Sequence, residues 1–77
     1  MDQHKRDREI RAVNRWLRDA YPGPFGPRYW LFDDGDGGVV VRGWRVERDG
    51  KPMGEHLALC RSMAEALAWI EAAIINQ

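Results

Sequence analysis

Few side chains in this sequence are of the types that do chemistry, and they stand at unrelated positions. The single cysteine, Cys60, and the two histidines, His4 and His56, lack the spacing of a zinc site. Cys60 comes just before an expected helix, where a thiol pKa can fall, but the sequence fixes no general base beside it. We therefore expect Cys60 to be a small buried residue, His56 to be structural, and the protein to use no catalytic residue, cofactor or metal.

An acidic run, Asp33-Asp34-Gly35-Asp36, invites a calcium interpretation. A calcium loop needs oxygen ligands at spaced positions and a bidentate glutamate about twelve residues along. Here valines follow almost at once, and the next acidic residue is Glu47. The neighbouring glycines are not followed by Lys-Ser or Lys-Thr, so they form no phosphate-binding loop either. The run is therefore predicted to be a hairpin turn.

Composition predicts one small folded domain over residues 1–77. Of the 77 residues, 44% are hydrophobic and four are tryptophan, which is enough for a core. Twelve basic and twelve acidic residues cancel, which argues against a purely electrostatic binder of nucleic acid or membrane. No apolar stretch approaches the roughly 18 residues of a membrane span, and a single cysteine fits a reducing compartment. We expect a cytoplasmic protein that makes no membrane contact.

Local signals predict two helices with three strands between them. Pro22-Gly23-Pro24 ends the first helical pattern, and Ser62-Met63-Ala64-Glu65 matches a capping box at the start of the last helix. The β-prone stretches are separated by turns, of which Asp49-Gly50 is typical of a tight hairpin. The expected elements are helices over Gln3–Tyr21 and Met63–Ile75, and strands over Arg28–Asp33, Val39–Arg48 and Lys51–Leu59.

The order α-β-β-β-α predicts an α+β fold, in which a three-stranded antiparallel sheet carries both helices on one face. Each helix has an apolar stripe, spaced at the helical period, that is suited to packing on the sheet. The first stripe is Ile10, Val13, Leu17, Ala20 and Tyr21, with Trp16 at its edge. The second is Met63, Ala66, Leu67, Ile70, Ala73 and Ile74.

The outer side of the last helix is apolar as well. From Met63 to Ile75 the only charged residues are Glu65 and Glu71. A helix that is apolar most of the way round is normally buried on two sides, which a domain of this size cannot easily do by itself. We therefore predict a protein interface, either with a second copy in a homodimer or with a foreign protein. The predicted interface residues are Ala64, Ala68, Trp69, Ala72 and Ile75, together with Trp30 from a strand whose two faces are both apolar.

A row of basic side chains follows the first helix on the side opposite its apolar stripe. At 100° per residue the row falls within an arc of about 80°. It could be an ordinary solvated face, because Asp7 can pair with Arg11 and Asp19 with Arg15. The alternative is a contact surface for phosphates or an acidic protein. The row consists of His4, Arg8, Arg11, Arg15 and Arg18.

The central strand allows two arrangements. A bulge at Gly43 would turn Trp44 inward with Val39, Val41 and Val46, and would leave Arg42, Arg45 and Glu47 facing solvent. Without a bulge, Trp44 and Arg42 share one face of the sheet. Exposed aromatic rings beside arginine suit either base stacking or a protein hot spot.

The element order resembles that of the double-stranded RNA-binding domain, which has a similar length. That family reads RNA partly through its first helix, which here would be the face of Arg8, Arg11, Arg15 and Arg18. It also uses a lysine cluster at the start of its second helix. The corresponding place in this chain reads Arg61-Ser62-Met63-Ala64-Glu65, with one basic residue.

The stretch from Val46 to Gly54, followed by Ser62 to Ile70, resembles small accessory proteins of phages and mobile elements, including anti-CRISPR inhibitors. The resemblance implies a non-catalytic protein, often dimeric, that occludes a surface on a larger partner. The sequence thus predicts a protein-binding module or inhibitor that is a homodimer. The alternative is a nucleic-acid-binding protein that uses the arginine face of the first helix and the strand arginines Arg42 and Arg45.

Overall fold

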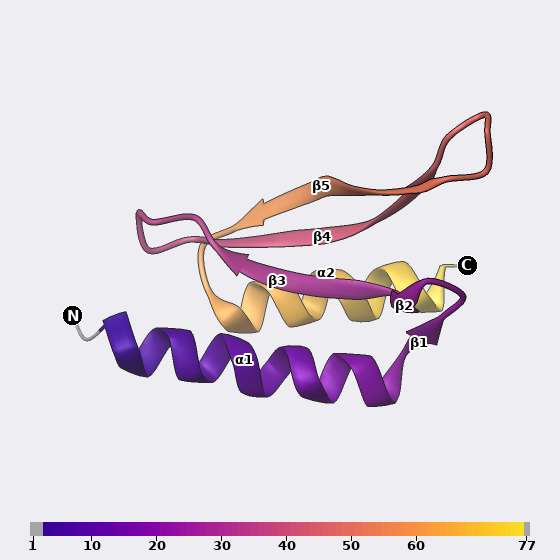
Figure 1. Ribbon diagram of the computed structural model, residues 1–77. Helices are drawn as coiled ribbons and strands as arrows, with labels where there is room; N and C mark the ends of the chain where they lie inside the picture. Colours follow the sequence, from indigo (N-terminus) through magenta and orange to yellow (C-terminus); the bar gives the residue numbers. More distant parts are fainter. Residues whose placement is uncertain (1–2, 77) are drawn as a thin grey trace.

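Two helices cover one face of a three-stranded antiparallel sheet, and the other face of the sheet carries no helix (Figure 1). The computed structural model describes residues 3–76. The helices are α1 (Gln3–Ala20) and α2 (Met63–Ile75), and the sheet has the order β3 (Tyr29–Asp33), β4 (Val39–Val46) and β5 (Pro52–Cys60). The strands β1 (Pro22–Gly23) and β2 (Gly26–Pro27) form a separate small ladder. The expected α+β class and element order are confirmed.

Proline chemistry ends α1 and shapes the segment that follows. Pro22 has no amide hydrogen, and the chain turns there into the β1–β2 ladder, which is not among the elements expected from the sequence. The amide of Arg28 donates to the carbonyl of Tyr21 (2.9 Å), which closes this segment at its base. Phe25 at the tip lies edge-on to Trp44, with ring centroids 6.1 Å apart, and remains 40% exposed.

The register of the sheet decides which side chains share a face. Val41 pairs with Ala58 and Arg42 pairs with His56, so Leu57 is an extra residue in β5. The bulge therefore lies in β5, and the alternative with a bulge at Gly43 is wrong. Side chains alternate regularly along β4, which places Arg42 and Trp44 on the same face.

The core lies between the helices and the inner face of the sheet. Ile70 and Leu17 come from the helices, and they meet Leu31 and Val41 from the sheet, each at most 1% exposed. Both predicted apolar stripes face this core, with one correction. Ala20 is exposed, because it lies about 60° round the helix from Leu17 and at the very end of α1. The remaining buried residues are Ile10, Val39, Cys60 and Ala66.

The start of α2 is capped as its sequence predicts. The hydroxyl oxygen of Ser62 accepts a hydrogen bond from the amide of Glu65 (3.1 Å). The Glu65 carboxylate in turn accepts from the amide of Arg61 (3.2 Å), one residue before the cap. Two amides at the helix start are thereby satisfied by side chains, which fixes where α2 begins.

The Asn14 side chain connects α1 to the edge of the sheet. Asn14 accepts a hydrogen bond from the amide of Leu31 (2.7 Å) and donates its own side-chain amide to the carbonyl of Leu31 (3.0 Å). Leu31 lies in the middle of β3, whose outer edge would otherwise present unpaired backbone groups. Asn14 thus supplies the hydrogen bonds that a neighbouring strand would make.

The first prediction concerns the core. Ile70→Ala should lower the free energy of unfolding by about 2–5 kcal/mol, because it leaves a cavity where α2 meets the sheet. Ile75→Ala, five residues along the same helix, is a matched control, because Ile75 is 71% exposed and its truncation should cost within about 0.5 kcal/mol. Urea denaturation followed by circular dichroism measures both. Equal effects of the two substitutions would contradict the orientation of α2.

The second prediction concerns the docking of α1. Asn14→Ala should destabilise the protein by about 1–3 kcal/mol, because two backbone groups of β3 lose their partner. Amide hydrogen exchange at Leu31 should also accelerate selectively. Arg15→Ala, at the next position and exposed, is the control and should leave that exchange rate unchanged. An unaltered Leu31 exchange rate in Asn14→Ala would show that the side chain does not hold the strand edge.

Candidate binding surfaces

The face of the sheet opposite the helices carries apolar and basic side chains. We call it the open face. On β3, Trp30 and Phe32 alternate with the buried Leu31 and therefore point away from the helices. The pairing of β4 with its neighbours extends this face across all three strands. The open face comprises Trp30, Phe32, Val40, Arg42, Trp44, Val46, His56 and Leu59.

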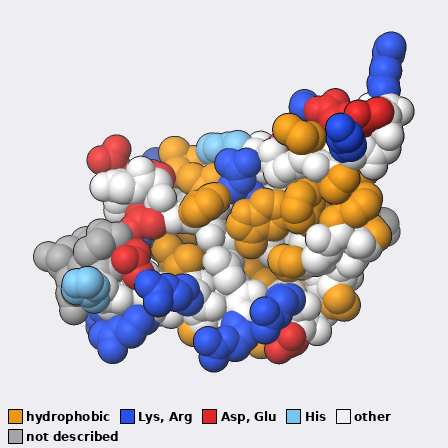
Figure 2. All heavy atoms as spheres, in the orientation of Figure 1, with side chains coloured by type: hydrophobic (Ala, Val, Ile, Leu, Met, Phe, Trp, Pro, Cys, Tyr) orange, Lys and Arg blue, Asp and Glu red, His pale blue; other side chains and the backbone are white. Residues whose placement is uncertain are grey.

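Three large side chains on the open face are strongly exposed: Phe32 at 54%, Val46 at 55% and Leu59 at 60%. Phe32 and Leu59 come from the two outer strands and flank Val40 on the central one, and Val46 lies at the other end of β4. Large apolar side chains that gather on one face normally mark a contact surface rather than a solvated one. Figure 2 shows hydrophobic side chains grouped over the strands.

The tryptophans of the open face are held in place by their neighbours. The Trp30 and Trp44 rings have centroids 4.8 Å apart, and the indole Nε1–H of Trp44 donates to the carbonyl of Pro27 (2.9 Å). Gly54 lies beneath the Trp30 ring, where a Cβ atom would come within 3.3 Å of it. A glycine at this position lets the large ring lie close to β5.

Arg42 brings positive charge to the centre of the open face. Its guanidinium carbon lies 5.8 Å from the centroid of the Phe32 ring, within the range of a cation–π contact. Arg45, the other predicted strand arginine, points to the opposite side of β4 from Arg42. It forms an ion pair with Glu47 (2.7 Å). The two strand arginines therefore do not form one surface.

The predicted basic row of α1 is exposed along its length, from His4 to Arg18. The expected pairs of Asp7 with Arg11 and Asp19 with Arg15 are absent among residues 3–76, and Asp19 approaches Arg18 instead (3.8 Å). Figure 2 shows Lys and Arg side chains along α1, below the apolar group. A groove joins the two surfaces; it is lined by Arg11, Asn14, Arg15, Arg18, Pro27 and Trp30.

Four of the five side chains predicted on the outer face of α2 are exposed to solvent. Ala64, Ala68, Ala72 and Ile75 are exposed. Trp69 is half-buried instead, because its ring lies edge-on to Tyr29 with centroids 6.1 Å apart. A second exposed tryptophan extends this apolar surface onto α1. Trp16, 52% exposed, lines a shallow apolar groove with Ala12, Val13 and Leu67.

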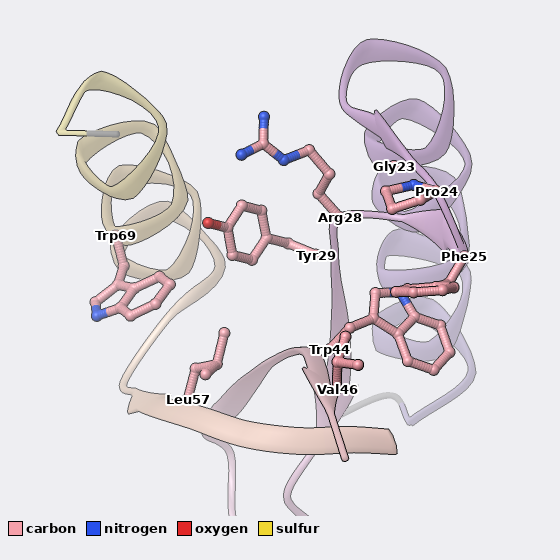
Figure 3. A pocket seen from close by; sticks show the side chains of 9 residues that line it. All are labelled: Gly23, Pro24, Phe25, Arg28, Tyr29, Trp44, Val46, Leu57 and Trp69. Atoms are coloured by element: carbon pink, nitrogen blue, oxygen red, sulfur yellow. The ribbon is translucent and has the colours of Figure 1, made fainter. Parts of the chain in front are cut away.

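The tip of the β1–β2 ladder helps to enclose a pocket of about 420 Å³ (Figure 3). Tyr29 reaches from β3 toward Trp69 on α2, and Leu57, the extra residue of β5, points into the same space. Phe25 and Trp44 form the opposite wall. Trp44 thus borders both this pocket and the open face, and four of the nine lining residues are aromatic.

The acidic run forms a turn that binds its own backbone. Asp34 Oδ1 accepts hydrogen bonds from the amides of Asp36 and Gly38, both at 2.8 Å. The Arg6 side chain of α1 donates hydrogen bonds to the carbonyls of Gly37 and Gly38 (2.7 and 2.8 Å), which connects the turn to the helix. Over residues 3–76 no group of three or more His, Cys, Asp or Glu side chains is placed to hold a metal ion. The expected hairpin turn is confirmed.

Cys60 is buried at the end of β5, as expected, with 3% of its surface exposed. Burial raises the pKa of its thiol, and the negative charge of Glu65 acts in the same direction. A raised pKa leaves less thiolate at neutral pH, and thiolate is the nucleophilic form. These surroundings disfavour nucleophilic chemistry at this residue.

No family model, curated protein or solved structure matches the chain. Within residues 3–76, no helix is long and apolar enough to cross a membrane.

Proposed function

We propose that this chain is a non-catalytic protein that acts by binding another macromolecule through the open face. One observation carries the proposal: Phe32 and Leu59 are each more than half exposed on a face that no helix covers. A sheet covered on one side normally turns polar residues to solvent on the other. Here that side offers aromatic rings and a guanidinium group, which suit contact rather than hydration alone.

The chemistry of the described residues supports binding over catalysis. Cys60 has a raised pKa and is buried, so it suits structure better than nucleophilic attack. His56 lies on the open face, cross-strand from Arg42. The cytoplasm, where thiols stay reduced, is the compartment that suits a protein with one buried thiol.

We also propose that the protein is a homodimer joined through its helical side. The exposed alanines of α2 allow a close approach by another helix, and Trp16 provides a large rigid side chain beside the shallow groove. A two-fold axis near this groove would place the tryptophan of each copy against the small residues of the other. Dimeric, non-catalytic binding is also what the resemblance to anti-CRISPR inhibitors implies.

The third prediction tests the open face. Tagged protein used as bait in the source cell should retain a specific partner, identified as protein or nucleic acid. The double variant Phe32→Ser with Leu59→Ser should lose it, because the substitutions remove the exposed apolar contacts. Met53→Ser is the control, since Met53 is 48% exposed but has the opposite alternation on β5. Circular dichroism checks that each variant folds. Retention of the partner by the double variant would refute the assignment of this face.

The fourth prediction tests the dimer. Sedimentation velocity at tens of micromolar should show a dimer, and Ala68→Glu should convert it to a folded monomer by placing charge in an apolar interface. Arg48→Glu introduces a carboxylate at an exposed position of the β4–β5 hairpin, away from both helices, and should leave the dimer intact. A monomeric wild-type protein would eliminate self-association.

A further inference from the structure

We infer that the partner of the open face is single-stranded nucleic acid, whose bases stack on Trp30 and Phe32 while α1 holds its phosphates. This inference rests on the proposed function, because it names the partner of the same surface. Trp30 and Phe32 point the same way from positions two residues apart on β3, a separation of about 7 Å. Stacking platforms of this kind beside basic grooves are how proteins bind single strands without reading sequence.

The charges around these rings complement a phosphate backbone. The side chains of the open face include Arg42 and His56 but no carboxylate. Trp30 also borders the groove lined by Arg11, Arg15 and Arg18. Neither Arg11 nor Arg15 forms an ion pair with any residue from 3 to 76, so their charges are available to a ligand. A single strand of nucleic acid that lies across Trp30 would therefore contact aromatic rings on the sheet and positively charged side chains on α1.

The same charges disfavour a second copy on this face. Packing two open faces together would bury two Arg42 side chains and two His56 side chains with no carboxylate from either face to pair with them. Unpaired buried charge is strongly destabilising. Two carboxylates, Asp7 and Asp33, line a groove with Phe32 and Arg11, and Asp33 forms an ion pair with Arg6 (3.4 Å). The charged residues of the groove beside Trp30 are all arginines, and further acidic residues lie in the turns. Asp34 and Asp36 are in the β3–β4 turn, and Glu47 and Asp49 are at the β4–β5 hairpin.

The geometry favours a single strand over a duplex. Bases in a duplex are stacked on one another and cannot reach rings that lie on a sheet surface. The double-stranded RNA-binding domain that this chain resembles instead uses its first helix with the start of its second. In this chain the start of α2 offers Arg61 alone, and the acidic β3–β4 turn lies nearby, since Arg61 and Asp36 line one pocket. Phosphates on that side would meet carboxylates.

Fluorescence anisotropy provides the test, with full-length protein and labelled probes of about twelve nucleotides, a length within the range of small single-strand sites. The probes are oligo(dT), oligo(U), and a DNA and an RNA duplex of equal length. At low salt we expect the single strands to bind in the micromolar range and the duplexes at least tenfold more weakly. Affinity for the single strands should fall with added salt, by a slope of about 0.7 per phosphate contact on logarithmic axes.

Matched variants separate stacking from charge. Phe32→Ala should weaken single-strand binding about tenfold. Met53→Ala, an exposed apolar side chain of β5 that points to the opposite face of the sheet, should leave it unchanged. Arg11→Glu with Arg15→Glu should weaken binding and flatten the salt dependence, whereas Arg61→Glu at the start of α2 should not. Thermal melts of all variants confirm that they fold.

Three outcomes would overturn the inference. One is no binding to any probe at low salt; the proposed function would still stand if the bait then retained a protein in a manner dependent on Phe32 and Leu59. The second is duplex binding that is lost in Arg61→Glu, which is the mode of the double-stranded RNA-binding domain. The third is single-strand binding that Phe32→Ala leaves intact, which would mean charge attraction without stacking.

Discussion

The docking of α1 against the edge of β3 is the contact on which the open side of the molecule depends. Asn14 satisfies both the amide and the carbonyl of Leu31, so the helix occupies the place that another strand would take. This arrangement closes one edge of the sheet to further strand pairing. It also sets the basic row of α1 beside Trp30, so that arginines from a helix and rings from a strand border one groove. Packing of Ile10 and Leu17 in the core and the ion pair between Arg6 and Asp33 (3.4 Å) hold the same helix against β3.

The second constraint is the small amount of chain available to cover a sheet. Two helices protect one face, and their apolar stripes meet the buried residues of β3, β4 and β5 there. Nothing in residues 3–76 covers the other face, which keeps Phe32 and Leu59 in contact with solvent. The helices themselves retain apolar surface on their outer side, at Trp16 and Ile75. A domain of this size buries a smaller fraction of its surface than a larger one, and the excess is available for partners.

The aromatic rings of the open face are held in fixed positions by contacts with neighbouring residues. Gly54 lets the Trp30 ring lie close to β5, Pro27 accepts the indole hydrogen of Trp44, and Phe32 lies beneath the Arg42 guanidinium. Rings that are already positioned lose little conformational freedom on binding, which favours affinity. The side chains with reactive groups lie away from the open face and have structural roles. Cys60 is buried in the core, and the carboxylate of Asp34 binds the backbone of its own turn.

The sequence by itself determined the parts of the fold that depend on neighbouring residues. Pro22 has no amide hydrogen with which to continue α1, and Ser62 and Glu65 cap α2 through groups three residues apart. Asp49-Gly50 forms a hairpin turn. Helical spacing also predicted which sides of α1 and α2 are buried, apart from Ala20 at the stripe's edge. The tertiary structure decided what depends on residues far apart. An extra residue at Leu57 in β5, rather than at Gly43, puts Arg42 and Trp44 together. Contact with Tyr29 half-buries Trp69, and the bond between Asn14 and Leu31 places the arginines of α1 beside Trp30. These outcomes depend on strand register and on packing between distant segments. The hydrophobic periodicity of a single segment does not specify either of them.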